Sequence, residues 1–407
     1  MIQPFVILYT ALLLAFSGCT PKQAPAVPPV PVATVPITPA AAPLKMGAAQ
    51  LELYLPELQG KRVGLIVNQT SMVGKTHLVD TLLSRGINVA TIFAPEHGFR
   101  GEADAGAHVK DAKDTKTGLP IISLYGSNRK PTPEQMQQID VLVFDIQDVG
   151  TRFYTYISTM HYAMEAAAEN NKPIFILDRP NPNGNYVDGP VLDPALKSFV
   201  GMHPIPIVHG LTVGELAKMI NGEKWLEGGR QANLTVIPVA NYTHQTAYTL
   251  PVKPSPNLPN QQAILLYPSL CLFEGTTVSV GRGTDTPFQV IGSPYYTSKA
   301  FSFTPQSTPG ATNPPHKGET CYGYDLTQPA DAQPFTLAFL LEMYQHSTQK
   351  DKFFNSFFEK LAGTPLLREQ IIAGKTEAEI RASWEPALTN YKQMRKQYLL
   401  YPDNAKL

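Results

Sequence analysis

Glu96 and His97 lie in the stretch FAPEHGFRG (93–101), where an apolar, strand-like run (88–93) ends in charged residues and glycines. A carboxylate at the end of a buried strand can lie in a partly dry cleft, where it can act as a general acid near neutral pH. Arg100 opposes this interpretation, because an ion pair with Glu96 would favour the charged carboxylate. The residues alone leave two possibilities open: a catalytic Glu96 with His97 beside it, or a Glu96–Arg100 ion pair in a polar turn.

Polar side chains also follow other apolar runs of the chain. At the end of 61–68 they are Asn68 and Gln69. At the end of 140–146 and just beyond it they are Asp145, Gln147, Asp148 and Arg152. At the end of 172–178 they are Asp178 and Arg179. Turn chemistry explains many Asn and Asp residues, but it does not predict Glu96, Gln147, Arg152 or Arg179. Because ligands of open α/β sheets bind beyond the carboxyl ends of the strands, we expect these side chains to converge on one pocket.

The expected ligand of this pocket is rich in hydroxyl groups, because carboxylates and amides form hydrogen bonds with sugar hydroxyls. Tyr154 and Tyr156 can offer ring faces to a sugar, and Arg152, Arg179 or Arg282 can pair with a carboxylate. Arg100 is a further substrate-binding candidate, and a second cluster, in 273–292, adds Glu274, Arg282 and Thr284. The alternative for Asp145 and Asp178 is that each caps the helix that follows it.

The sequence lacks the motifs that are typical of several other kinds of chemistry. The sequence contains no HxH, HExxH or DxHxxH spacing and no GxSxG turn, so we expect neither a metal nor a serine nucleophile. No GxGxxG follows the first predicted strand, so no dinucleotide cofactor is expected. Lysine plus arginine equals aspartate plus glutamate at 33 each, which argues against a nucleic-acid partner.

The elements that must position these residues alternate along the chain. We predict strands at 61–68, 88–93, 118–126, 140–146 and 172–178, with helices at 76–86, 133–139 and 155–171 between them. This order predicts an α/β fold, a Rossmann-like, mostly parallel sheet over 47–205. A smaller α+β domain over 206–407 is expected to complete the cleft, with a helix at 211–223, a strand at 234–239, β-rich stretches in 262–292 and helices after 334.

The N-terminus is typical of a lipoprotein. Residues 1–19 are apolar, too short to span a bilayer comfortably, and end in FSGC, which indicates a signal peptide with lipidation at Cys19. Residue 20 is not an aspartate, so the outer membrane facing the periplasm is the expected location. Residues 20–46 form a Pro/Ala-rich linker.

The sequence leaves open whether Cys271 and Cys321 form a disulfide or stay as two free thiols.

Long motifs of the chain resemble those of the exo-β-N-acetylmuramidase family of bacterial cell-wall recycling. They are NQTS (68–71), APEHGFRG (94–101), SLYG (123–126), FDIQDVGTRFYTY (144–156), LDRPNPNG (177–184) and FEGTTVSVGRGTDTPFQVIG (273–292). The resemblance runs from about residue 47 to the C-terminus. It implies a Rossmann-like domain and a smaller C-terminal domain with the active site between them, removal of N-acetylmuramic acid from the non-reducing end of peptidoglycan fragments, and Glu96 as the catalytic glutamate.

The second catalytic group stays open among Asp145, Asp148, Asp178, Glu274 and the acetamido group of the substrate itself. The expected partners are a muropeptide or disaccharide substrate and a membrane, reached through the lipid on Cys19. The alternative function is that of a non-catalytic lipoprotein that binds muropeptides, because the same cleft and arginines would serve it.

Overall fold

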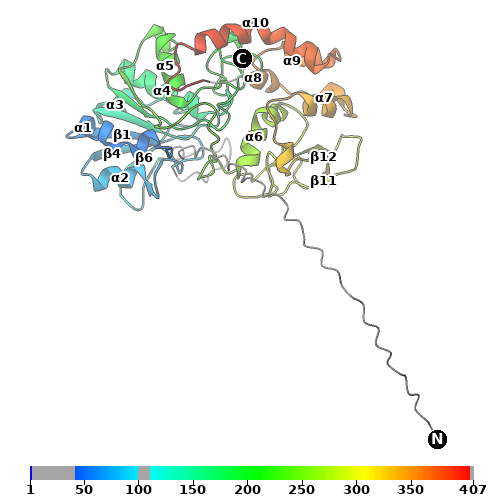
Figure 1. Ribbon diagram of the computed structural model, residues 1–407, viewed down its shortest axis with the longest axis horizontal. Helices are drawn as coiled ribbons and strands as arrows, with labels where there is room; N and C mark the ends of the chain where they lie inside the picture. The colour runs from blue at the N-terminus through cyan, green and yellow to red at the C-terminus, as the bar shows by residue number, and fades with distance from the viewer. Residues whose placement is uncertain (2–41, 100–110, 404–407) are drawn as a thin grey trace, which may run out of the picture. The chain divides into compact units, whose positions relative to one another are not determined.

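A seven-stranded sheet forms the centre of the N-terminal half (Figure 1). The computed structural model describes residues 1, 42–99 and 111–403, and residues 42–407 form one compact unit. The strands are β1 (Arg62–Val67), β4 (Asn88–Ala94), β5 (Ala112–Lys113), β6 (Pro120–Ser123), β7 (Val141–Asp145), β8 (Ile174–Leu177) and β9 (Leu234–Ile237). The predicted strands at 61–68, 88–93, 118–126, 140–146, 172–178 and 234–239 are therefore confirmed.

The strand order is β5-β6-β4-β1-β7-β8-β9, and every neighbouring pair is parallel except β5 with β6. The chain first winds from β1 towards β6 and then from β7 towards β9, so the direction of winding reverses between β1 and β7. Such a reversal opens a crevice at the carboxyl ends of the central strands, where open α/β sheets bind their ligands. The Rossmann-like, mostly parallel sheet is confirmed.

Alternate side chains of the strands enter two separate cores. Val141 and Val143 of β7 pack in one core, and Leu142 and Phe144 pack in the other. Helices α1 (Leu55–Leu58) and α2 (Leu78–Ser84) cover the first face of the sheet. Helices α3 (Pro133–Gln137), α4 (Tyr156–Glu169) and α5 (Val213–Gly222) cover the second. Burial on both faces explains why the central strands are almost continuously apolar.

The C-terminal half surrounds a small antiparallel sheet of β10 (Val290–Ser293), β12 (Cys321–Asp325) and β11 (Ser302–Phe303). Its helices are α6 (Gln261–Leu270), α7 (Ala338–Gln345), α8 (Phe358–Ala362), α9 (Leu366–Ile372) and α10 (Glu377–Arg395). The mostly helical C-terminus is confirmed. The β-rich expectation for 262–292 is wrong at its start, where α6 forms. The Asn260 side chain caps this helix by accepting from the Ala263 amide, 3.0 Å away, and a short apolar run does not by itself distinguish a strand from a helix.

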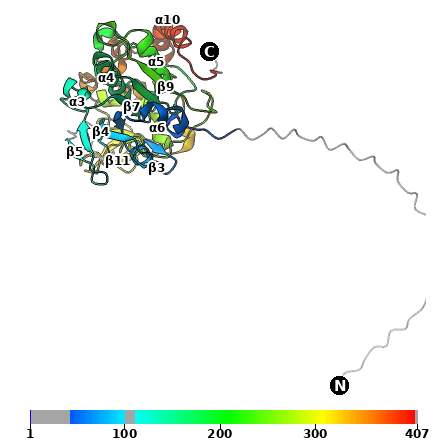
Figure 2. The ribbon, with the colours of Figure 1, turned by 90° about the vertical axis from the view of Figure 1, so that its left-hand side faces the viewer.

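Helix α10 returns to the N-terminal half and ties the two halves together, as the turned view also shows (Figure 2). The Tyr391 hydroxyl donates to the carbonyl oxygen of His209 at 2.7 Å, and Arg395 Nε donates to that of Gly210 at 3.1 Å. The large sheet and α5 extend past residue 205, where a domain boundary was expected; that division of the chain stays a prediction.

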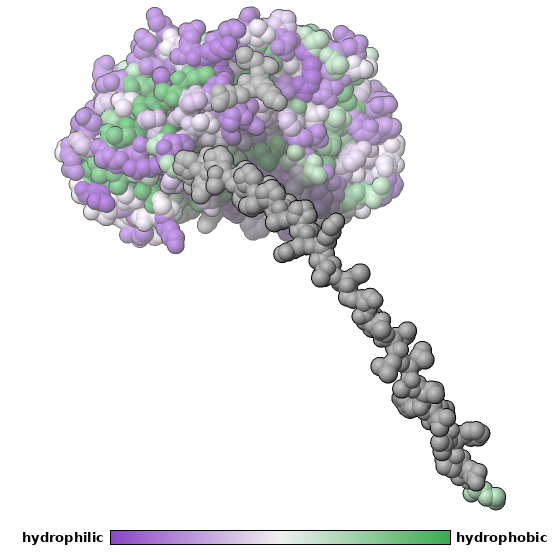
Figure 3. All heavy atoms as spheres, in the orientation of Figure 1, coloured by the Kyte–Doolittle hydropathy of each residue, from purple (hydrophilic) through white to green (hydrophobic). Residues whose placement is uncertain are grey.

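Hydrophilic side chains cover most of the face seen in Figure 3, with smaller hydrophobic patches between them. Within the described part of the chain, we find no helix of the length and apolar character needed to cross a membrane. Cys19 lies outside the described residues, as do the rest of the predicted signal peptide and the linker up to residue 41.

Candidate active site

A cavity of about 550 Å³ lies between the carboxyl edge of the large sheet and the C-terminal half. The N-terminal half contributes Glu96, His97, Tyr125, Arg129, Phe153, Tyr154, Thr155, Tyr156, Ser198, Phe199 and Val200. The C-terminal half contributes Ser255, Asn257, Leu258, Tyr267, Cys271, Glu274, Arg282, Phe288, Phe357, Lys360 and Leu361. The predicted cleft between two halves is thus present, and its volume falls within the range typical of small-molecule sites.

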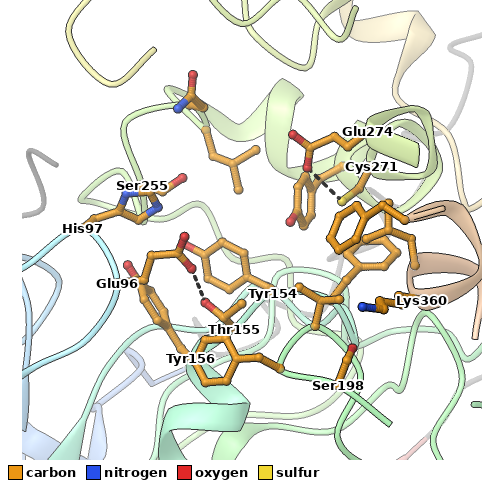
Figure 4. A pocket seen from close by; sticks show the side chains of 18 of the residues that line it. Glu96, His97, Tyr154, Thr155, Tyr156, Ser198, Ser255, Cys271, Glu274 and Lys360 are labelled. Atoms are coloured by element: carbon orange, nitrogen blue, oxygen red, sulfur yellow. Dashed lines mark hydrogen bonds between the residues drawn. The ribbon is translucent and has the colours of Figure 1, made fainter. Parts of the chain in front are cut away.

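Glu96 lies at the end of β4, half-buried, with its carboxylate in the cavity (Figure 4). Thr155 lies at the N-cap of α4, but its hydroxyl donates to Glu96 Oε2 at 2.6 Å instead of capping the helix. His97 follows with a φ of 68°, in the left-handed region that non-glycine residues seldom adopt. The tight turn places both Glu96 and His97 on the cavity wall, so these two candidates lie where the sequence predicted.

Three tyrosines surround the Glu96 carboxylate. Burial raises the pKa of Tyr125, and the charge of Glu96 and a hydrogen bond with it raise that pKa further. Burial also raises the pKa of Tyr156, again with a contribution from Glu96. The ring of Tyr154 packs edge-on against Tyr156 and Tyr267, at centroid distances of 4.9 and 5.8 Å. The Tyr156 hydroxyl donates to the Pro254 carbonyl oxygen at 3.1 Å, so Tyr156 offers ring surface to a sugar, whereas Tyr154 can also offer a hydroxyl donor.

Glu274 faces the cavity from the opposite side to Glu96 (Figure 4). Arg282 Nε donates to Glu274 Oε1 at 2.7 Å, and its guanidinium carbon lies 5.1 Å from the Phe288 ring centroid. Burial lowers the pKa of Arg282, but the charge of Glu274 and the hydrogen bond with it, with smaller contributions from Tyr267 and Cys271, together raise that pKa above its usual value. Among the described residues that line the cavity, Glu96 and Glu274 are the only carboxylates.

The Cys271 thiol lies 3.5 Å from Glu274 Oε2. Burial raises its pKa well above the usual value, and Glu274 adds to this effect. A protonated thiol is a poor nucleophile, which agrees with the interpretation of Cys271 as a core residue. Cys271 and Cys321 are both free thiols in the structure, so the disulfide left open by the sequence does not form.

Asp145 and Arg179 do not line the cavity. Arg179 Nε and Nη2 donate to the two carboxylate oxygens of Asp145 at 2.6 and 2.9 Å, and both side chains are buried. A third Arg179 hydrogen bond reaches the carbonyl oxygen of Met72. The charges at the ends of β7 and β8 therefore neutralise each other. This placement does not support the catalytic role predicted for Asp145 or the substrate contact predicted for Arg179.

Asp178 is also buried and away from the cavity. It accepts hydrogen bonds from the Thr212 hydroxyl at 2.7 Å, from the Gly214 amide at 2.8 Å and from the Tyr401 hydroxyl. Burial raises its pKa to about 6, although these donors lower it. Asp178 thus joins the end of β8 to the start of α5, which matches the helix-capping alternative given above, and to the C-terminal segment.

Four further substrate-binding candidates hold the protein together instead of lining the cavity. Gln147 donates to the carbonyl oxygens of Asp148 and Pro180. Asp148 accepts from the Gly150 amide at 2.7 Å, and Asn68 accepts from the Thr70 amide at 2.9 Å. Thr284 donates to the Gly281 carbonyl oxygen within a turn.

Two other candidates, Gln69 and Arg152, position the cavity wall. Gln69 Nε2 donates to the carbonyl oxygens of Lys253 and Pro254, just before the wall residues Ser255 and Asn257. Arg152 is fully buried, and its guanidinium nitrogens donate to four carbonyl oxygens, those of Pro190, Ile205, Leu361 and Ala362. Arg100, the remaining candidate, lies outside the described residues.

The sequence analysis missed several wall residues. Thr155 lies inside the motif 144–156, so its position next to Tyr154 was a signal that could have found it. Tyr125 likewise ends a predicted strand, in SLYG. Arg129, Ser198 and Lys360 carry no such signal, because no motif contains them and only the folded chain brings them to the cavity.

Comparisons with known proteins agree with this arrangement. The family models described as exo-beta-N-acetylmuramidase NamZ, N-terminal and C-terminal, match residues 63–262 and 265–401. Peptidoglycan beta-N-acetylmuramidase NamZ of Bacillus subtilis (strain 168) is 41% identical over 377 residues, which cover 86% of this chain and 89% of that protein. The junction of the two matched segments lies after β9, the last strand of the large sheet.

Two crystal structures of DUF1343 family proteins from Bacteroides fragilis NCTC 9343 share the fold. The first has a TM-score of 0.83 at 50% identity and covers 89% of this chain and 100% of its own. The second has a TM-score of 0.76 at 32% identity and covers 88% of this chain and 99% of its own.

Proposed function

The chain belongs to the NamZ family of exo-β-N-acetylmuramidases, which are glycosidases, and we propose that it removes N-acetylmuramic acid from the non-reducing end of peptidoglycan fragments with Glu96 as the general acid. The observation that carries this proposal is the position of Glu96 in the cavity, with Thr155 holding one carboxylate oxygen. A carboxyl group fixed in this way can protonate the glycosidic oxygen while the bond to the anomeric carbon breaks.

Glu274 is the carboxylate that can serve as the second group. Asp145, Asp148 and Asp178 are absent from the cavity wall, whereas Glu274 faces Glu96 across it. Its carboxylate is held in place by Arg282, and a fixed negative charge stabilises an oxocarbenium-like transition state. In this scheme Glu274 either activates the attacking water or supports attack by the acetamido group of the substrate.

The tyrosines and the apolar wall complete the sugar site. Tyr154 offers a hydroxyl donor and Tyr156 offers its ring edge on the side of Glu96, and Phe288 and Tyr267 lie on the side of Glu274. Apolar surface on both sides excludes water from the space between the two carboxylates, which strengthens their electrostatic action on the reacting bond.

Product analysis with the defined disaccharide N-acetylmuramyl–N-acetylglucosamine tests this function. The wild-type protein should release the two free sugars, and Glu96→Gln should lower the rate about 1,000-fold, because the amide cannot donate the catalytic proton. The variant should still bind free N-acetylmuramic acid. An unchanged rate in Glu96→Gln would contradict the role of Glu96, and binding without any turnover by the wild type would favour the alternative of a muropeptide-binding protein.

We propose further that the protein is a lipoprotein of the cell envelope, anchored through Cys19 at the outer membrane and facing the periplasm. The apolar residues 1–19, the FSGC sequence and the Pro/Ala-rich segment that follows support this proposal. Cys19→Ala should abolish incorporation of labelled palmitate and move the protein from the membrane fraction to the soluble fraction. Membrane association that survives this substitution would contradict the anchor.

A further inference from the structure

Three cationic side chains line the cavity within the described residues, and they differ in their partners. Arg282 is paired with Glu274, and the Arg129 guanidinium lies over the Phe199 ring, 4.6 Å from its centroid. Lys360 has neither an ion pair nor a hydrogen bond in the structure, and it is exposed at the cavity wall. Lys360 and Ser198 both line the cavity, and in Figure 4 both lie on the side away from His97.

Ser198 adds a second unsatisfied group to this part of the wall. Its hydroxyl oxygen is buried and has no hydrogen-bond partner in the structure. A buried hydroxyl without a partner costs free energy, so such a group commonly binds a ligand or water. An ammonium group and a hydroxyl donor on the wall of one cavity suit a carboxylate, which accepts hydrogen bonds on both of its oxygens.

The backbone that carries Lys360 is held rigidly relative to Glu96. Buried Arg152 donates to the carbonyl oxygens of Leu361 and Ala362, directly after Lys360, at 2.8 and 2.7 Å. Burial lowers the pKa of Arg152 to about 9, which leaves it charged at neutral pH. Gly363 leaves space for this guanidinium, since a Cβ there would lie 2.4 Å from Arg152 Nη2. Three residues after Arg152, Thr155 holds Glu96, so one short segment fixes both the acid and the lysine.

We propose that Lys360 and Ser198 form the subsite for the lactyl carboxylate of the muramic acid residue, which makes Lys360 a specificity-determining residue. This inference rests on the proposed function. The lactyl group is attached at O3, whereas Glu96 must reach the glycosidic oxygen on C1, so a bound sugar needs its carboxylate contact away from the acid. The arginines that the sequence offered for this contact are engaged elsewhere: Arg152 and Arg179 are buried away from the sugar, and Arg282 is held by Glu274.

Two chromogenic substrates test the subsite: para-nitrophenyl N-acetyl-β-muramide and its lactyl methylamide, which lacks the negative charge. Lys360→Met should lower kcat/KM for the acid about 30-fold, the size expected for a hydrogen bond between charged groups, and change the value for the methylamide less than about 3-fold. Lys360→Arg should retain most activity on the acid. Lys352→Met, which removes an equally exposed lysine outside the cavity, is the charge-matched control and should change neither value.

Binding measurements separate this inference from the proposed function. Calorimetry on the Glu96→Gln protein should show that adding Lys360→Met weakens the binding of N-acetylmuramic acid about 30-fold. The binding of its lactyl methylamide should stay nearly unchanged. Equal weakening of both ligands, or of neither, would overturn the subsite even if the wild-type protein hydrolyses muramides. Carboxylate-dependent binding without any hydrolysis would instead overturn the proposed activity and retain the subsite. Thermal unfolding of Lys360→Met should match that of the wild type.

Discussion

Two groups of charged residues lie at the carboxyl edge of the same sheet, and they are used differently. The first, the buried cluster, consists of Asp145, Asp178 and Arg179, whose oxygens and nitrogens are bonded to other protein groups. The second, the cavity carboxylates, consists of Glu96 and Glu274, which face the open volume between the two halves. Both groups follow apolar strands or helices, so their sequence contexts look alike.

The difference teaches that a charge at a strand end is not by itself a catalytic group. In the buried cluster the protein itself provides the counter-charge, and the pair holds β7 and β8 together at their ends. In the cavity Thr155 donates to Glu96 and Arg282 donates to Glu274, and the open volume beside the two carboxylates leaves room for a ligand. Substitutions in the first group should therefore affect folding, and those in the second should affect turnover.

The largest effect on folding should come from Arg179→Met. This substitution leaves the Asp145 carboxylate buried without its counter-charge, which should lower the free energy of unfolding by about 4 kcal/mol. The matched control is Arg282→Met, which breaks the partly exposed pair with Glu274 and should cost about 1 kcal/mol. Urea unfolding followed by circular dichroism measures both. Equal losses would show that the two pairs do not differ as the comparison requires.

The pH dependence of stability should distinguish Asp178 as a member of the buried cluster. Its folded pKa of about 6 lies above the usual 3.8, so between these values the folded protein holds a proton that the unfolded chain has lost. The free energy of unfolding should therefore fall as the pH rises through this window, by about 3 kcal/mol, and stay level above it.

The Asp178→Asn variant isolates this titration, because the amide does not ionise and the Thr212 and Tyr401 hydroxyls can turn to accept from it. The difference in unfolding free energy between wild type and variant should change between pH 4 and pH 6. A difference that is constant over this range would contradict the raised pKa.

Glu274→Gln should lower kcat about 100-fold while changing the free energy of unfolding little. The amide keeps the shape of the side chain but removes the negative charge that faces the reacting sugar. Steady-state kinetics on the chromogenic muramide and urea unfolding of the same preparation measure the two effects. If Glu274→Gln loses as much stability as Arg179→Met but keeps its kcat, then Glu274 has a structural role like that of the buried cluster and no catalytic one.

The sequence predicted the sheet well, because buried parallel strands carry continuous apolar runs that helices separate. The ends of β1, β4, β7 and β8 lie within two residues of the predicted positions. Helix α6 was not predicted, since its apolar run contains Pro268 and has no clear helical period. Its capping residue, Asn260, was the local signal that a helix begins there.

The site was predicted less completely than the fold. Motif position identified Glu96, His97, Tyr154, Glu274 and Arg282, which all line the cavity. It did not separate these from Asp145 and Arg179, because the sequence shows which charges end a strand but not which charges meet. Lys360 and Ser198 come from segments with no motif, and only tertiary packing brings them to the wall. For Lys360, this packing includes the hydrogen bonds from Arg152 to the end of α8.

The smallest effect should come from Thr155→Val, which removes the hydroxyl that orients Glu96 and keeps the shape of the side chain. We expect kcat to fall about 10-fold with little change in KM, because the acid remains present but is less well aligned with the glycosidic oxygen. Thr155→Ser should restore most of the rate. Thr159→Val, one turn further along α4 and without a contact to Glu96, is the matched control and should leave kcat within about 2-fold of the wild type. If Thr155→Val and Thr159→Val behave alike, then the bond from Thr155 does not position the acid, and the other contacts of Glu96, such as that with Tyr125, would orient it.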